Sequence, residues 1–130
     1  MMKSRESIIR LKRFHVEEKH RRVAQIETMI AEFERMAKEL DNQILAEQER
    51  SGIHDAGHFA YPTFAKAAMQ RRDNLTASVA ELKEQLVAAK AECDEAAEDL
   101  QKHEAIAQRD QANDRHAAQE SAPETAAATR

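Results

Sequence analysis

Few residues in this 130-residue chain could do chemistry, and most of them lie far apart. His54, Asp55 and His58 are the best candidate for a metal cluster, because two histidines four residues apart share a face when their segment is helical. Asp55 is the only third ligand nearby, so polar loop residues are the simpler interpretation. We therefore expect no metal site and no cofactor.

Nucleophilic and acid–base chemistry has equally little support. Cys93 is the single cysteine, which excludes an internal disulfide, and its place in a helical apolar pattern favours a small buried side chain over a nucleophile. Carboxylates are numerous, but they are expected on exposed helical faces without a concave pocket to shift their pKa values. Neither Gly52 nor Gly57 belongs to a phosphate-binding Gly-x-x-x-x-Gly-Lys motif. We assign no catalytic residue and expect a protein that is not an enzyme.

The composition indicates long helices instead of a layered globular core. Charged residues make up 34% of the chain and aromatic residues 4%, and there are only two glycines and two prolines. Both glycines and Pro62 fall near the middle, where they divide the chain into two arms. We expect a helix over about residues 4–51, a turn over about 52–61 and a helix over about 62–110, with Pro62 in its first turn.

Both arms carry the heptad spacing of a coiled coil. In the first arm the apolar seam consists of Val23, Ile26, Ile30, Phe33, Ala37, Leu40 and Ile44. In the second arm the seam consists of Leu75, Val79, Leu82, Leu86, Ala89, Cys93, Ala96, Leu100, His103 and Ala107. Two matched arms, each about 70 Å long at ~1.5 Å per residue, predict an all-α fold, a long antiparallel two-helix coiled-coil hairpin over residues 1–110. A parallel two-chain coiled coil is the main alternative.

Charge is distributed unevenly along the chain. Residues 1–22 carry eight basic and three acidic side chains, whereas residues 75–110 carry four basic and nine acidic ones. In an antiparallel hairpin these oppositely charged segments lie side by side and attract each other. This pairing explains the basic segment more simply than nucleic-acid binding does, because no stacking aromatics interleave it and Glu17 and Glu18 interrupt it.

The seam is thin at the open end of the predicted hairpin, which should therefore fray. Extending the first register backward places Lys12 and Lys19 on the seam and leaves Leu11 and Phe14 off it. A local shift of register, returning Ile8, Leu11 and His15 to the interface, is the simpler explanation. The alternative is that Leu11 and Phe14 form an outward apolar contact for a partner.

Residues 111–130 contain no bulky apolar residue, and we expect a disordered C-terminal tail there. The N-terminal residues contain no apolar run resembling a secretory signal, and no segment approaches the ~18 apolar residues of a membrane-spanning helix. We therefore expect a soluble protein without direct membrane insertion.

The aromatic residues gather in the turn, in the segment HFAYPTF. Phe59, Tyr61 and Phe64 cannot all enter a two-helix seam, so they either fold over the turn as a plug or remain exposed as anchors for a partner. Arg71 and Arg72 follow them and form a small basic face.

The segments SRESIIRLKRFHVEEKHRRVAQIETMIAEFERMAKELD and GHFAYPTFAKAAMQRRDNL resemble the FliJ family of flagellar export proteins, in its alphaproteobacterial form. The resemblance covers roughly residues 3–105, and HFAYPTFAKAA followed by RRDNL is its most specific part. It implies a non-enzymatic component of the flagellar type III export apparatus, cytoplasmic and peripheral to the basal body.

The family resemblance also implies partners. They are the hexameric export ATPase, whose ring assembly the protein promotes, the cytoplasmic part of the export gate, and export chaperones. By analogy with rotary stalks, the end with both termini would contact the ATPase and the turn would face the gate. A generic coiled-coil scaffold and a prefoldin-like holdase chaperone are the alternatives.

Overall fold

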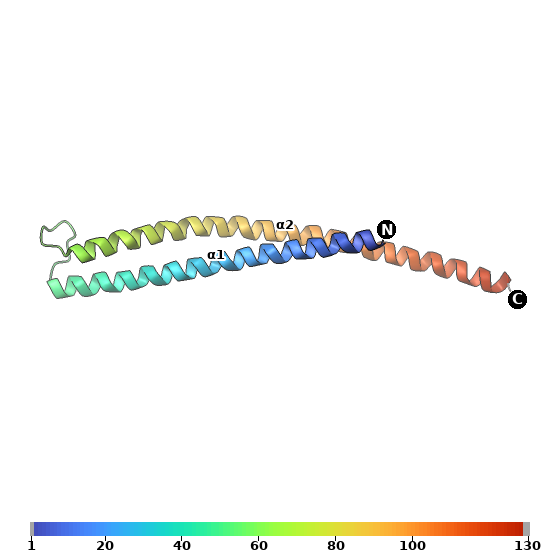
Figure 1. The fold of residues 1–130 in the computed structure, drawn as a ribbon, viewed down its shortest axis with the longest axis horizontal. Helices are drawn as coiled ribbons and strands as arrows, with labels where there is room; N and C mark the ends of the chain where they lie inside the picture. Colours follow the sequence, from blue (N-terminus) through green and yellow to red (C-terminus); the bar gives the residue numbers. More distant parts are fainter. Residues whose placement is uncertain (1, 129–130) are drawn as a thin grey trace. The chain divides into compact units, whose positions relative to one another are not determined.

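The computed structural model describes residues 2–128, with the side chains of residues 3–120, and contains two long α-helices packed against each other as a hairpin (Figure 1). Helix α1 spans Met2–Ser51 and helix α2 spans Thr63–Ala128. The predicted all-α antiparallel hairpin is confirmed. The two helices of one chain pack against each other, in contrast to the parallel two-chain alternative.

The break between the helices follows from local backbone chemistry. Gly52 adopts a φ of 75°, and its N–H donates to the carbonyl of Gln48 at 2.8 Å, which ends α1 with a left-handed cap. Pro62 lies just before Thr63, one position earlier than the first turn in which it was expected. Its carbonyl accepts the first bond of α2, from the N–H of Lys66 at 3.1 Å.

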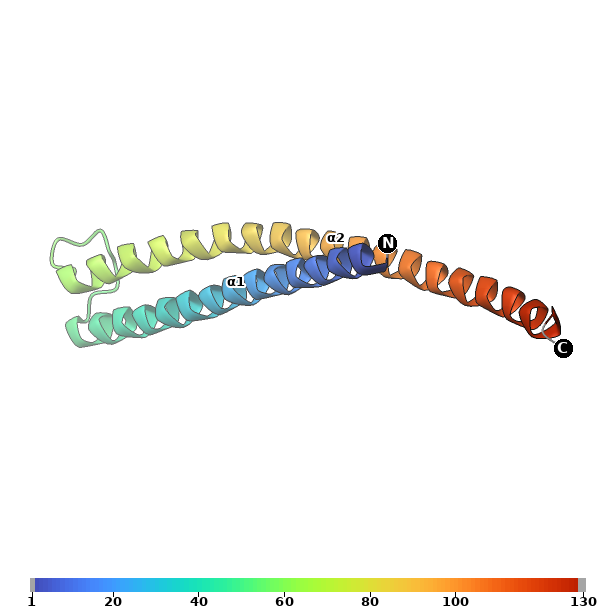
Figure 2. The same cartoon turned by 45° about the vertical axis from the view of Figure 1, so that its right-hand side comes forward.

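The chain divides into two compact units, each of which contains a segment of α1 beside a segment of α2 (Figures 1 and 2). Residues 21–90 form the turn unit. Its core is a cluster of Ile26, Leu82 and Ala89, against which Val23, Ile30, Phe33 and Leu86 pack. Phe33 of α1 and Leu82 of α2 are thus members of one cluster.

Residues 1–20 and 91–130 form the terminal unit. Its seam buries Ile9 and Cys93, and Val16, Ala96, Leu100, His103 and Ala107 are half-buried. Arg5, Lys12 and Lys19 are also half-buried, at a spacing of seven residues. The heptad register of α1 therefore continues unchanged into the terminal unit, with cations at every second seam position.

The predicted shift of register near the N-terminus is wrong. Ile8, Leu11 and His15 are exposed, with 70% of the Leu11 surface accessible. The shift is unnecessary because acids on α2 lie opposite the cations at the seam. A lysine stem can bury its methylenes while its ammonium group reaches an acid at the edge of the interface.

Helix α2 continues well beyond the end predicted near residue 110. The segment expected as a disordered tail is helical to Ala128, and residues 129–130 lie outside the described residues. Residues 111–120 are exposed at every position, in keeping with their lack of bulky apolar side chains. They contain neither glycine nor proline, and extending an existing helix avoids the cost of nucleating a new one.

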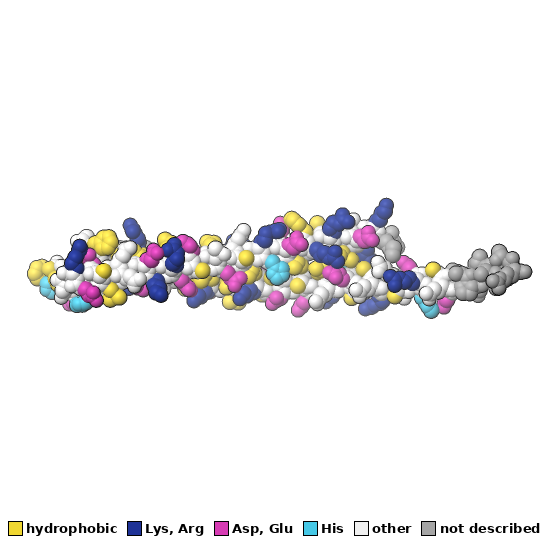
Figure 3. Space-filling model, turned by 90° about the horizontal axis from the view of Figure 1, so that it is seen from below, with side chains coloured by type: hydrophobic (Ala, Val, Ile, Leu, Met, Phe, Trp, Pro, Cys, Tyr) yellow, Lys and Arg dark blue, Asp and Glu magenta, His cyan; other side chains and the backbone are white. Residues whose placement is uncertain are grey.

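The seam positions named from the sequence are buried or half-buried throughout. Ile44 and Val79 are buried, and Leu40 and Leu75 are half-buried. Charged side chains of both signs are interspersed over the face shown in Figure 3, as expected for helices whose apolar residues lie in a narrow seam.

Candidate interaction surfaces

The turn is held in shape by its own hydrogen bonds. The Asp55 carboxylate accepts the N–H of Gly57 at 3.0 Å, and the Asp55 carbonyl accepts the N–H of His58 at 3.0 Å. The carbonyl of His58 accepts the N–H of Tyr61 at 3.1 Å, and its ring nitrogen Nδ1 accepts the N–H of Ala60 at 3.0 Å. These bonds leave the aromatic segment with a defined backbone.

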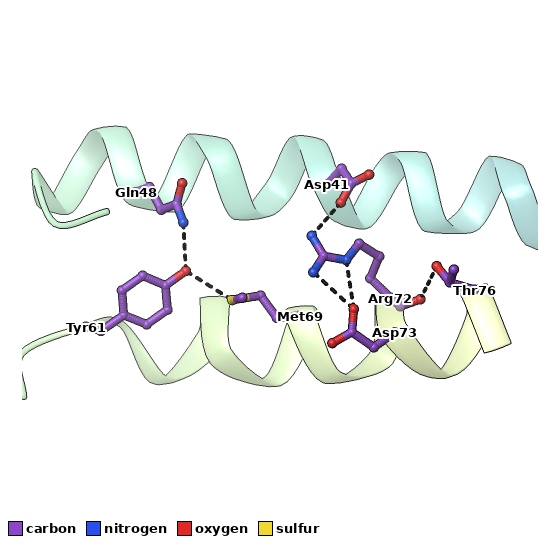
Figure 4. Close-up of polar contacts among 7 residues, drawn as sticks. All are labelled: Asp41, Gln48, Tyr61, Met69, Arg72, Asp73 and Thr76. Atoms are coloured by element: carbon purple, nitrogen blue, oxygen red, sulfur yellow. Dashed lines mark hydrogen bonds and ion pairs between the residues drawn. The ribbon is translucent and has the colours of Figure 1, made fainter. Parts of the chain in front are cut away.

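Tyr61 points inward from this turn (Figure 4). Only 7% of its surface is exposed, and its hydroxyl accepts a hydrogen bond from the Gln48 side chain at 2.9 Å. The same hydroxyl donates to the sulfur of Met69 at 3.4 Å. Ala65 and Ala68, in the first turns of α2, are also buried. Tyr61 is therefore the plug of the turn, with little surface left for a partner.

Phe59 and Phe64 point outward. Phe59 is 96% exposed, and its ring stacks on that of His58 with centroids 4.7 Å apart and an interplanar angle of 22°. Phe64 is 58% exposed at the first turn of α2. Two solvent-facing phenylalanines on a hydrogen-bonded turn are the kind of rigid aromatic side chains that anchor interfaces. The two explanations of the aromatic cluster thus apply to different members of it.

The two predicted basic residues after the turn have different environments. Arg71 is exposed. Arg72 is half-buried, and its guanidinium donates to Asp41 on α1 at 2.9 Å and to Asp73 at 3.0 Å (Figure 4). The hydrogen bond to Asp41, with the one to Asp73, raises the pKa of Arg72. Arg72 therefore links α2 to α1 through its ion pair with Asp41, and Arg71 is the cation available to a partner.

The terminal unit is joined by a series of ion pairs between α1 and α2. Arg5 pairs with Asp110, and Lys12 pairs with Asp99. A third seam cation, Lys19, pairs with Glu92 at 3.0 Å. At the edge of the interface Arg13 lies 3.9 Å from Glu104. The basic start of the chain therefore meets acidic residues of α2 one pair after another.

Sequence reasoning placed Lys12 and Lys19 on the extended seam but did not identify their partners. The pairing could have been predicted from the spacing of the charged residues in the two helices. Cations recur every seven residues at positions 5, 12 and 19, and acids lie seven apart at positions 92 and 99. Oppositely charged residues at the same period on antiparallel helices can meet repeatedly along the interface.

Leu11 and Phe14, predicted as a possible outward contact, do lie on the outer face of α1. Leu11 is 70% exposed, Phe14 is 52% exposed, and Ile8 on the preceding turn is 44% exposed. Leu11 and Phe14 belong to the terminal unit and the turn aromatics to the turn unit, so the two predicted contact regions lie in different units.

The described residues contain no group of three or more histidine, cysteine, aspartate or glutamate side chains placed to hold a metal ion. His54 and Asp55 are exposed loop residues, and His58 already engages the Ala60 N–H and the Phe59 ring. Within residues 2–128, neither helix is long and apolar enough to cross a membrane.

Comparison with known proteins returned no relatives. No protein-family model matches the chain. No curated protein is significantly similar to it in sequence, and no solved structure matches it significantly.

Proposed function

We propose that this protein is a non-enzymatic, FliJ-like component of the flagellar type III export apparatus. In this role it binds the hexameric export ATPase, promotes assembly of the ATPase ring, and links it to the cytoplasmic part of the export gate and to export chaperones. The proposal rests on the resemblance of HFAYPTFAKAA and RRDNL to segments of that family. The antiparallel two-helix hairpin, which is the fold of that family, supports it.

The geometry of the turn is consistent with a binding role. Phe59 and Phe64 present apolar rings to solvent, and Arg71 lies on the following helix. Leu11 and Phe14 supply a second exposed surface on the terminal unit. Two accessible surfaces in two different units suit a protein that links one assembly to another.

The deciding experiment uses the flagellar export ATPase of the same organism. Its ATP hydrolysis rate and its ring assembly, seen by electron microscopy, are measured with and without the purified full chain. We expect faster hydrolysis and more rings. A folded, helical protein that neither binds nor stimulates the ATPase would contradict the proposal and favour a generic coiled-coil scaffold. Suppression of aggregation of an unfolded client protein, without ATPase binding, would instead favour the holdase.

A further inference from the structure

The ring of His58 connects the backbone of the turn to an exposed aromatic side chain. Its Nδ1 accepts a hydrogen bond from the N–H of Ala60 at 3.0 Å. The same ring stacks on that of Phe59, with centroids 4.7 Å apart and an interplanar angle of 22°. Phe59 is almost fully exposed, so the imidazole is what orders its ring against the loop.

The hydrogen bond to Ala60 requires one protonation state of the imidazole. A backbone N–H can only donate, so the Nδ1 that accepts from it carries no proton, and the proton of the neutral ring lies on Nε2. In the imidazolium form both nitrogens are donors. Nδ1 would then point a proton at the N–H of Ala60, and the hydrogen bond would be lost.

The His58 ring is open to this change. The residue is exposed to solvent, so protons reach it without any opening of the hairpin. Histidine is the side chain whose charge ordinarily changes between about pH 5 and pH 8. The hydrogen bond is therefore present while the ring is neutral and is lost as the pH falls and the ring gains its second proton.

The surrounding charges offer the protonated ring no replacement for that bond. The other titratable residues of the loop and of the adjoining helix ends are Glu47, Glu49, Arg50, His54, Asp55, Tyr61 and Lys66. Arg50 pairs with Glu47, and the Asp55 carboxylate accepts the N–H of Gly57. Among the side chains of residues 3–120, none forms an ion pair with the His58 ring.

The rest of the turn does not depend on the imidazole. The main chain of His58 donates to the carbonyl of Asp55 at 3.0 Å and accepts the N–H of Tyr61 at 3.1 Å. Tyr61 itself is buried between the helix ends. Loss of the Nδ1 bond therefore frees the rings of His58 and Phe59 without unfolding the loop.

We propose that His58 is a pH-sensitive latch of the turn. The neutral ring holds the N–H of Ala60 and orders the ring of Phe59, and protonation releases both. A partner that uses Phe59 thus meets a pre-ordered ring at neutral pH and a more mobile ring in acid, where binding must also order it. The latch itself does not depend on the role in flagellar export.

Nuclear magnetic resonance of the full chain, titrated from about pH 8 to about pH 5, tests the proposal. At the upper pH, long-range proton–nitrogen spectra should show Nδ1 of His58 without a proton. As the ring gains its second proton, protection of the Ala60 amide from exchange should fall by about fivefold after correction for the intrinsic pH dependence, as expected for the loss of one hydrogen bond. The nuclear Overhauser effect between the His58 and Phe59 rings should weaken over the same pH range.

Two substitutions separate the latch from a general effect of pH. In His58→Asn the side-chain oxygen can accept the same N–H two residues further on, but it does not titrate. The Ala60 amide should then stay protected throughout the titration. His54→Asn removes another exposed histidine of the loop and is the matched control, in which the pH response of Ala60 should be that of the wild type.

A neutral His58 ring that carries its proton on Nδ1 overturns the proposal, because that nitrogen could not accept from Ala60. It is also overturned if Ala60 keeps its protection while His58 gains its second proton, or if the pH response survives in His58→Asn. Loss of the response in His54→Asn would mean that His54, and not His58, controls the turn.

Discussion

The side chain of Gln48, in the last turn of α1, donates a hydrogen bond of 2.9 Å to the hydroxyl of Tyr61 in the loop. Through Met69, which accepts from the same hydroxyl, Tyr61 also contacts the first turns of α2. One buried ring thus joins the end of one helix, the loop and the start of the next. The aromatic segment contains a structural member, Tyr61, and two exposed members, Phe59 and Phe64.

This division predicts different effects of substitution on stability. Tyr61→Phe removes the hydroxyl and should lower the free energy of unfolding by about 1 kcal/mol. Tyr61→Ala leaves a cavity as well and should cost about 3 kcal/mol. Phe59→Ala is the matched control, because its ring is 96% exposed, and should change the value by less than about 0.5 kcal/mol. Urea unfolding followed by circular dichroism measures all three.

If Phe59→Ala destabilises the protein as much as Tyr61→Ala does, the ring of Phe59 packs against the turn in solution. The separation of structural and exposed members would then be incorrect.

The cations at the seam of the terminal unit predict that apolar replacements stabilise the hairpin. Lys12 lies between Ile9 and Val16 in the heptad, and its side chain is 28% exposed. Lys12→Leu loses the pair with Asp99, but that acid is 48% exposed and regains water, so leucine burial should dominate. We expect a gain of about 1 kcal/mol in thermal or urea unfolding.

Lys38→Leu provides the control for that substitution, because Lys38 lies on the exposed outer face of α1. It should give no comparable gain. A loss of stability in Lys12→Leu would mean that the ion pair contributes more than a buried leucine at this position.

The ion pairs of the terminal unit also predict a local sensitivity to salt. Surface ion pairs weaken as ionic strength rises, whereas the apolar cluster around Ile26 and Leu82 does not depend on screening. Hydrogen exchange measured by mass spectrometry should therefore quicken with added sodium chloride in residues 5–19 and 92–110. Peptides covering residues 23–44 serve as the internal control and should show little change. Uniform acceleration across both regions would contradict this distinction.

Asp99 predicts a pH dependence in the same unit. The hydrogen bond from Lys12 lowers the pKa of the Asp99 carboxyl below its usual value. Because the folded pKa lies below the unfolded one, the stabilisation is complete above about pH 4 and is lost as pH falls through the folded pKa. Carbon-13 NMR titration of the side chain should show a depressed pKa that rises in Lys12→Met. An unchanged pKa in that variant would show that Lys12 does not hold the carboxylate.

The fold was predictable because its information is periodic and local. Seven-residue spacing of apolar residues located the seam from Val23 to Ile44, and Gly52, Gly57 and Pro62 located the break. The register near the N-terminus was harder, because a lysine at a seam position is acceptable only if an acid lies opposite. For Lys12 and Lys19 that acid lies 87 and 73 residues away in sequence, on the other helix. Local composition could not supply that partner.

The orientation of the turn aromatics was likewise beyond the sequence. Phe59, Tyr61 and Phe64 lie within six positions, and their spacing does not determine which side chain is buried and which is exposed. The outcome depends on Gln48 being within reach of one hydroxyl, which is a property of the closed turn. A phenylalanine has no such polar partner to seek, so Phe59 and Phe64 were free to face outward.

The same division sharpens the functional test of the turn. If the protein links the export ATPase to the gate, the double substitution Phe59→Ala with Phe64→Ala should weaken binding to the cytoplasmic part of the gate by about tenfold or more, because aromatic anchors dominate many interfaces. Tyr61→Phe should bind normally, since its ring is buried, and stimulation of ATP hydrolysis should persist in both variants. Pull-down with the gate domain, a motility assay and an ATPase assay distinguish these outcomes. Normal gate binding with lost ATPase stimulation in the double variant would mean that the turn contacts the ATPase, and the orientation taken from rotary stalks would be reversed.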